Sequence, residues 1–159
     1  MNSDKQAGFS LIELLIVLLM INILAAVAIT AYIGMTDKAR RSVIIRTASS
    51  ATDEVNLWLQ SSFSPNRDNR DVDTNFDGKI DVGDKTNEEL LNDGVAETYA
   101  EGRNALGETS PWFPMKMWAF ENLLPNGRIT LIQLSSTHIR ITGRGKSGII
   151  LYENNLTVD

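Results

Sequence analysis

The feature that most constrains this chain is a long apolar run near its N-terminus, "FSLIELLIVLLMINILAAVAITAYIGM", over residues 9–35. From Leu14 to Ile29 only Asn22 interrupts the apolar residues. A helix needs about 20 such residues to cross the hydrocarbon core of a bilayer. The run exceeds the roughly 7–15 residues of a secretory signal, and no A-x-A cleavage site follows it. A soluble protein would have to bury it in a large core, which the more polar remainder is too small to supply. The run therefore predicts one transmembrane helix.

The composition excludes several other classes of protein. The chain has no cysteine, which rules out disulfides, cysteine zinc sites and a thiol nucleophile. Its net charge of −5 argues against nonspecific binding to nucleic acid. The single histidine, His138, lies beside a predicted strand, and no Ser-His-Asp set is recognisable. We therefore expect no enzyme and no nucleic-acid partner.

The apolar helix is predicted to continue well beyond the membrane. No proline or strong breaker occurs over residues 36–62, and an apolar stripe recurs there at helical spacing, formed by Ile44, Ala48, Ala51, Val55 and Trp58. Pro65 and a cluster of Asn and Asp follow and end the helix. This pattern predicts one helix over residues 9–62, with a membrane half at 9–35 and an amphipathic half at 36–62.

The rest of the chain predicts an α+β fold. Residues 63–111 form a connecting region with a short helix at 85–92 and an irregular, glycine-containing stretch at 93–111. Residues 112–159 hold short β-branched or aromatic runs separated by "PNG", "SST" and "GRGK", which are turn sequences. They predict an antiparallel sheet of three or four strands. Its dry face would cover the apolar stripe of the helix, because neither surface is stable alone.

The start of the chain resembles the N-terminus of type IV pilins and of the pseudopilins of type II secretion. In that family a short polar leader ends in glycine, an aromatic residue follows the cut, and a glutamate stands four positions later within a long apolar helix. Here those residues are Gly8, Phe9 and Glu13, with residues 1–8 as the leader. The close resemblance covers about 25 residues, and the helix followed by a sheet is similar to the pilin-like fold in outline.

The resemblance implies a structural subunit of a type IV pilus or pseudopilus. A prepilin peptidase would cut after Gly8 and methylate the new amine of Phe9. The precursor would cross the inner, cytoplasmic membrane once, with its C-terminal domain outside the cytoplasm. It would then leave the lipid for a surface pilus or a periplasmic pseudopilus. The implied partners are copies of itself or homologous pilins, the peptidase, a membrane assembly platform, and membrane lipid before assembly.

Glu13 is the one acid within the apolar run, and a carboxylate at a helix centre costs roughly 2.5–3.5 kcal/mol on insertion scales. Cleavage would create an opposite charge, the Phe9 ammonium, at a matching depth. We expect the Glu13 carboxylate of one subunit to pair with the Phe9 amine of its neighbour and so set axial register, as buried polar residues do in coiled coils. The alternative is that Glu13 lies near the membrane surface and reaches the headgroups.

Three features depart from the family pattern. Asn22 and Thr30 stand where many members have a helix-weakening glycine and proline, so we expect the helix to stay continuous. Many members also close their C-terminal loop with a disulfide, which this chain cannot form because it has no cysteine. Lys38, Arg40, Arg41 and Arg46 follow the apolar run, whereas Lys5 alone precedes it, and the positive-inside rule would then place the domain in the cytoplasm. A second class of function also stays open: a single-pass anchored, calcium-stabilised binding module outside the cytoplasm that forms no filament.

A separate motif, "DTNFDGKIDVGD" over residues 73–84, fits a 12-residue calcium loop of the EF-hand or dockerin type. Gly78 holds the position of the sharp turn. Oxygen ligands at this spacing suit Ca²⁺ as a structural cofactor, and no soft ligand favours a transition metal. The alternative is a set of Asx turns in a solvated acidic loop. The expected ligands are Asp73, Asn75, Asp77, the Lys79 carbonyl, Asp81 through water, and Asp84.

Overall fold

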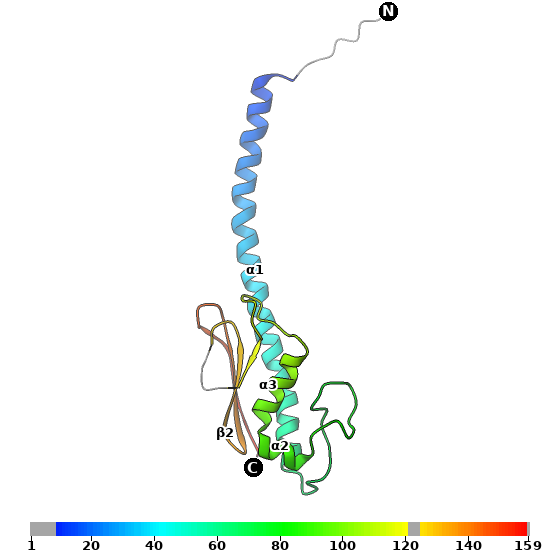
Figure 1. Ribbon diagram of the computed structural model, residues 1–159. Coiled ribbons are helices and arrows are strands. Elements are labelled where there is room, and N and C mark those ends of the chain that lie inside the picture. The colour runs from blue at the N-terminus through cyan, green and yellow to red at the C-terminus, as the bar shows by residue number, and fades with distance from the viewer. Residues whose placement is uncertain (1–8, 121–124, 159) are drawn as a thin grey trace, which may run out of the picture. The chain divides into compact units, whose positions relative to one another are not determined.

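The computed structural model describes residues 9–120 and 125–158. Its first element is a helix, α1 (Leu11–Ser62), and the chain divides into two compact units, Met1–Ala39 and Arg40–Asp159. The remaining elements all belong to the second unit (Figure 1). They are α2 (Asn87–Asp93), α3 (Val95–Ala105), β1 (Trp118–Ala119), β2 (Ile129–Ser135), β3 (His138–Arg144) and β4 (Ile150–Thr157). The fold is α+β, as the sequence predicts.

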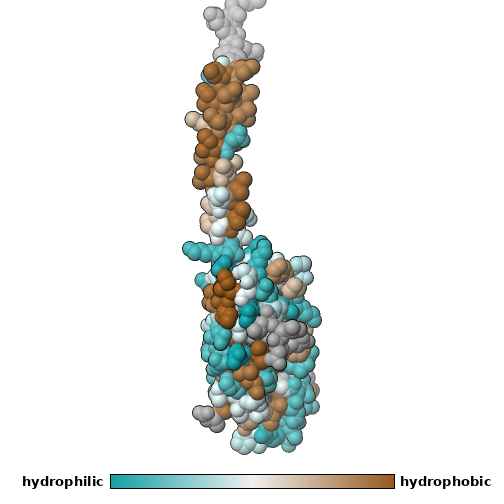
Figure 2. Space-filling view, turned by 90° about the vertical axis from the view of Figure 1, so that its left-hand side faces the viewer, coloured by the Kyte–Doolittle hydropathy of each residue, from teal (hydrophilic) through white to brown (hydrophobic). Residues whose placement is uncertain are grey.

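The part of α1 in the first unit is apolar on all sides. It contains an 18-residue window of mean hydropathy 2.8, no part of which is buried. Large side chains there are 46% to 81% exposed between Leu11 and Met35. Figure 2 shows hydrophobic residues over the visible face of this segment and mainly hydrophilic residues over the second unit. By length and composition, this helix is able to cross a membrane.

In the second unit the predicted apolar stripe of α1 is buried. Ile44, Ala48 and Val55 are fully inaccessible, and Ala51 and Trp58 are at most 5% exposed. The sheet covers this stripe. Gly143 of β3 lies so close to α1 that a Cβ there would be 2.8 Å from Ile44 Cγ2. The Tyr152 hydroxyl of β4 is 2.7 Å from the Thr52 hydroxyl. The prediction that sheet and helix share one core is confirmed.

The sheet is mixed rather than wholly antiparallel. Its order is β1-β2-β3-β4, and the β2–β3 and β3–β4 pairs are antiparallel, but β1 runs parallel to β2 with Trp118 beside Ile129. The prediction of a wholly antiparallel sheet was wrong because of prolines: Pro111 and Pro114 have no backbone N–H to donate to a ladder. The run "WFPMKMWAF" therefore yields one isolated bridge, Thr109 to Lys116, and the two-residue β1 instead of a full hairpin strand.

The connecting region is more ordered than predicted. The short helix expected at 85–92 is α2, which begins with Thr86 as N-cap and Glu89 completing a capping box. The stretch expected to be irregular contains α3, so that prediction was wrong. Gly94, with φ +89°, separates the two helices, and buried Val95 and Tyr99 give α3 a face toward the core. Gly94 therefore marks a helix boundary, and Gly102 lies within α3 in close contact with Phe76.

Candidate functional site

The acid of the N-terminal motif caps its own helix. The Ser10 backbone N–H donates to Glu13 Oε2 at 2.9 Å, and the Leu14 N–H donates to the Ser10 carbonyl at 3.2 Å. Ser10 is thus the residue before the first helical turn, and Glu13 occupies the third helical position, as in a capping box. A carboxylate in the first turn also interacts favourably with the helix dipole. Sequence reasoning missed this role, although the S-x-x-E spacing of residues 10–13 is its usual signal.

The other two motif residues lie at the edge of the described chain. Phe9 is 82% exposed and precedes the first helical residue, Leu11. Gly8 lies outside the described residues. Phe9 therefore lies before the first turn of α1, and cleavage after Gly8 stays a prediction. The pairing of Glu13 with a neighbour's amine stays a prediction, since it involves a second chain.

The helix passes without interruption through both positions where the family pattern would weaken it. Asn22 and Thr30 lie inside α1, and the Thr30 hydroxyl donates to the Val27 carbonyl at 2.9 Å, which satisfies that hydroxyl within the helix. A Cβ added at Gly34 would meet no atom within 4 Å, so this glycine too is an ordinary helical position. One continuous helix is therefore confirmed for the single chain, and its continuity within a filament stays a prediction.

The predicted calcium loop is held in shape by its own side chains. Asp73 accepts from the Gly78 N–H at 2.8 Å and from the Asp77 N–H at 3.2 Å. Asn75 Oδ1 accepts from the Asp77 N–H at 2.8 Å, and Asp77 Oδ1 accepts from the Lys79 N–H at 2.9 Å. Gly78 has φ +87°, a conformation that favours glycine. The predicted sharp turn is present, built from successive Asx-type bonds.

Asp84, the last predicted ligand, is an internal anchor of this loop. It is 4% exposed, and its Oδ1 accepts from the Thr74 N–H at 2.7 Å and from the Asn75 N–H at 3.2 Å. Its Oδ2 accepts from the Asp81 N–H at 2.9 Å. Burial acts to raise the pKa of Asp84, but these backbone bonds, with the Thr74 hydroxyl, outweigh burial and lower the pKa below its ordinary value.

The loop suits a hard cation by donor type. Its side chains offer carboxylate and amide oxygens, which Ca²⁺ prefers. The ends of Asn75 and Asp81 meet beside Gly83, where a Cβ would lie 3.0 Å from Asn75 Nδ2 and 3.1 Å from Asp81 Oδ1. Within residues 9–120 and 125–158, however, no three or more acidic or histidine side chains converge closely enough to hold a metal. The carboxylates bond backbone N–H groups instead of surrounding one point.

The same loop is joined to the core through Phe76. This residue has φ +59°, uncommon for a bulky side chain, and its ring stacks on Trp58 of α1 with centroids 5.4 Å apart. It also meets Tyr99 edge-on at 5.7 Å. Arg103 lies over the Phe76 ring at 5.7 Å and forms an ion pair with Glu108 at 2.8 Å. A phenylalanine within an acidic, turn-rich loop is the sequence signal for such an anchor, and it was missed.

Comparison with known proteins bears on the N-terminal motif. The family model described as the prokaryotic N-terminal methylation motif matches residues 3–29. Residues 3–29 carry the prokaryotic N-terminal methylation motif. The match includes the expected cleavage residues Gly8 and Phe9 and also Glu13. No curated protein and no solved structure matches the chain significantly.

The methylation motif indicates a type IV pilin-like precursor. The pilin-like family is typically structural rather than enzymatic. The motif and the apolar first part of α1 together fit a precursor anchored in a membrane. Because the match ends at residue 29, it does not extend to the buried stripe of α1, the mixed sheet or the acidic loop.

Proposed function

We propose that this protein is a structural subunit of a type IV pilus or pseudopilus, assembled through its N-terminal helix after leader cleavage between Gly8 and Phe9. The observation that carries the proposal is the methylation motif at residues 3–29, which overlaps the first part of the 52-residue helix α1. The first part of that helix is apolar on every side and exposed.

The exposed apolar surface requires a covering. Side chains such as Leu11, Leu24 and Met35 are 69% to 81% exposed, and burial of apolar area is worth about 25 cal/mol per Å². Lipid supplies that covering for the precursor. In a filament, the same segments of neighbouring subunits would cover one another. The second unit needs no such cover, because its core is closed by its own sheet and α3.

Glu13 is the residue that would fix the axial register of neighbouring subunits in this assembly. Cleavage before Phe9 creates an ammonium four residues from Glu13 in sequence. The charge pair between neighbours would lie in a dry bundle, where an unpaired carboxylate is strongly unfavourable. Only subunits with the right axial offset would satisfy it. The bond from Ser10 N–H to Glu13 keeps the carboxylate partly satisfied before a neighbour arrives.

Two measurements test this proposal. Mass spectrometry of the mature chain is expected to find an N-methylated Phe9 at the N-terminus. Electron microscopy of sheared surface or periplasmic material is expected to show filaments that depend on this chain. Glu13→Ala is expected to abolish or misregister them, whereas Glu88→Ala, which removes an exposed acid on α2, serves as the matched control.

A functional chain that still begins at Met1 would exclude the pilin-type route and leave an anchored module that forms no filament. Normal filaments from Glu13→Ala would exclude the register role while leaving cleavage intact.

We also propose that loop 73–84 binds Ca²⁺ as a structural cofactor. Support comes from the oxygen donors at the spacing of a 12-residue loop, the turn at Gly78 and the meeting of Asn75 with Asp81. Binding would draw together carboxylates that repel one another and would hold a loop that no disulfide secures. Modules outside the cell bind this ion with dissociation constants of about 10⁻⁴–10⁻³ M, so millimolar calcium is the relevant range.

Calcium is therefore expected to raise the melting temperature of the purified protein. Asp77→Ala is expected to abolish that rise, and Asp68→Ala, an exposed acid outside the 12-residue loop, is expected to preserve it. A melting temperature unmoved by calcium and by chelator would refute the metal site.

A further inference from the structure

A group of cations follows the apolar run and has no part in the proposed assembly. Lys38, Arg40, Arg41 and Arg46 lie within a dozen residues of Met35. The positive-inside rule would place them in the cytoplasm, whereas the methylation motif indicates a pilin-like precursor, whose domain lies outside. Their presence beside the membrane on that side needs a physical reason.

The β3–β4 turn brings further cations to the same end of the second unit. Gly143 packs against Ile44, and Arg40 lies one turn earlier on the same face of α1. The chain continues past Gly143 through Arg144 and Lys146 before β4 begins. Figure 1 shows this turn at the end of the second unit where α1 enters it. Arg40 is the first residue of that unit, five residues after the apolar run ends.

The turn is a built feature of the fold. The Gly145 N–H donates to the Ile149 carbonyl at 2.9 Å, and the Gly127 N–H donates to the Gly145 carbonyl at 3.0 Å. Arg144 Nη1 donates to the Gly148 carbonyl at 3.1 Å, which fixes that cation within the turn. Lys146 is exposed at the tip.

Exposed apolar residues accompany these cations. Ile149 and Ile150, which leave the turn, are 56% and 48% exposed. We call Arg40, Arg144, Lys146, Ile149 and Ile150 the basic end. A surface that combines cations with bulky aliphatic side chains matches the interface of an anionic bilayer, where phosphates meet the first methylenes.

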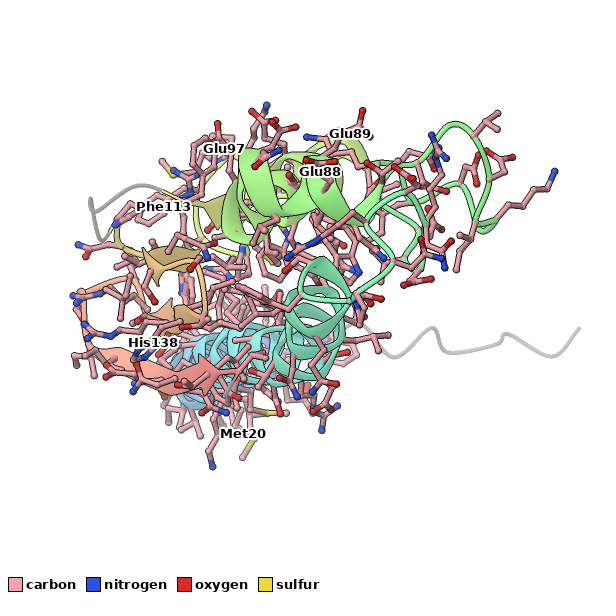
Figure 3. All side chains as sticks on the ribbon, turned by 90° about the horizontal axis from the view of Figure 1, so that it is seen from below. Met20, Glu88, Glu89, Glu97, Phe113 and His138 are labelled. Atoms are coloured by element: carbon pink, nitrogen blue, oxygen red, sulfur yellow. The ribbon has the colours of Figure 1, made fainter. Side chains whose placement is uncertain are left out.

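Acids gather at a different part of the second unit. Glu88 and Glu89 of α2 and Glu97 of α3 are exposed, and Figure 3, seen from below, labels them on these two helices. Near the basic end, the acids closest in sequence are Asp37 and Glu153, which offset only part of its charge. An anionic surface would attract the basic end and repel the α2–α3 face.

We propose that the basic end docks the second unit of the precursor onto the anionic headgroups of the membrane that anchors it. The inference rests on the membrane-anchored precursor of the proposed function and not on filament formation. Like charges held together repel one another, and lipid phosphates relieve that repulsion. Docking orients the domain on the bilayer with its acidic α2–α3 face turned away.

The expected strength follows from surface electrostatics. Each Lys or Arg near an anionic leaflet strengthens binding by about fivefold, within a Debye length of about 8 Å at physiological salt. Reversing one charge, as in Lys146→Glu, is then expected to lower the ratio of docked to undocked domain by roughly 25-fold. Salt near 1 M, where the Debye length is about 3 Å, is expected to undock the domain.

The test uses the full precursor in lipid vesicles. The chain has no cysteine, so Ser147→Cys in the turn and Asn92→Cys on α2 each give one labelling site for a fluorophore. Phosphatidylcholine vesicles that carry a headgroup nitroxide lipid are compared with the same vesicles containing about one third phosphatidylglycerol. Label at residue 147 is expected to be quenched in the anionic vesicles and released by salt or by Lys146→Glu. Label at residue 92 is expected to stay unquenched.

A matched control separates this surface from overall charge. Lys85→Glu makes the same charge change just before α2, outside the basic end and outside the 12-residue loop, and is expected to leave quenching at residue 147 unchanged. Equal quenching in neutral and anionic vesicles would overturn the proposal. Quenching that instead rises with the ratio of protein to lipid would assign the basic end to a second copy and also overturn it. Flotation with the vesicles is scored separately, because its failure would contradict the anchored precursor.

Discussion

Replacing Gly102 by alanine tests how tightly loop 73–84 is joined to the core. In the interior of an exposed helix, Gly→Ala usually stabilises by about 0.5–1 kcal/mol, because alanine restricts the unfolded chain and favours the helix. At Gly102 of α3, however, a Cβ would lie 2.5 Å from Phe76 Cε2 and 2.7 Å from Cδ2. It would also lie 3.2 Å from the Thr74 carbonyl oxygen. Gly102→Ala should therefore lower the free energy of unfolding instead of raising it.

The size of the effect follows from these contacts. Forcing a methyl group into a packed site typically costs about 1–3 kcal/mol. The Phe76 ring has little room to retreat, since Trp58 stacks on it at 5.4 Å and Tyr99 meets it edge-on at 5.7 Å. Subtracting the helix gain leaves a net destabilisation of about 0.5–2 kcal/mol. That corresponds to a fall in melting temperature of roughly 2–8 °C.

The assay is unfolding of the purified full chain in detergent, followed by tryptophan fluorescence, which reports on Trp58 beside the perturbed ring. The control is the same substitution in a Phe76→Ala background. Without the ring, Gly102→Ala is expected to stabilise, because the helix gain remains and most of the overlap is gone. A Gly102→Ala protein as stable as the parent, with Phe76 present, would refute this account of the packing.

Three further predictions concern single polar contacts. Because the folded pKa of Asp84 is depressed, its stabilisation is present above about pH 4 and is lost as pH falls through the folded pKa, so Asp84→Asn should flatten acid unfolding curves. Tyr99→Phe removes a 2.5 Å bond to the partly exposed Glu54 and should cost about 1 kcal/mol in urea unfolding; an unchanged midpoint would contradict this. Thr86→Ala removes the cap bond to the Glu89 N–H and should lower stability by about 1 kcal/mol, measurable by thermal unfolding, whereas Thr86→Ser should not.

The long helix and its partner surface were accessible from sequence because they depend on periodicity over many residues. The apolar run and the stripe from Ile44 to Trp58 each repeat a signal several times, so single exceptions such as Asn22 do not obscure it. The end of α1 at Ser62 follows from Pro65 and the polar cluster around it. Both ends of this helix were predicted to within two residues.

The α3 helix was missed because its signal is short and contains contrary residues. Gly94, Gly102 and Gly107 suggest a loop, but only Gly102 lies within the helix, and its reason is a tertiary contact that the sequence alone does not reveal. Gly94 and Gly107 have positive φ at or beyond the helix ends, and Gly102 admits Phe76 from a distant segment. Tertiary packing here overrides a local preference of about 1 kcal/mol per glycine.

The candidate sites divide in the same way. Gly8, Phe9 and Glu13 were predicted through a resemblance of motif, and they lie within the residues that match the methylation motif. The cap formed by Glu13 was missed, although the spacing of Ser10 and Glu13 is the usual signal for it. For loop 73–84, spacing indicates oxygen ligands, but it does not reveal that Asp84 turns inward to backbone N–H groups.

The bond between the Ser10 N–H and Glu13 reduces the net free energy that Glu13 gains when it pairs with the amine of a neighbouring subunit. An acid that already has a donor exchanges one partner for another, and such exchanges have small net free energies. The free energy that holds such a polymer together would come from burial of the apolar helix surfaces. The Glu13 carboxylate would mainly select one axial offset between neighbouring helices. Substitution at Glu13 should then disturb the regularity of the helical lattice more than the mechanical strength of whatever fibres still form.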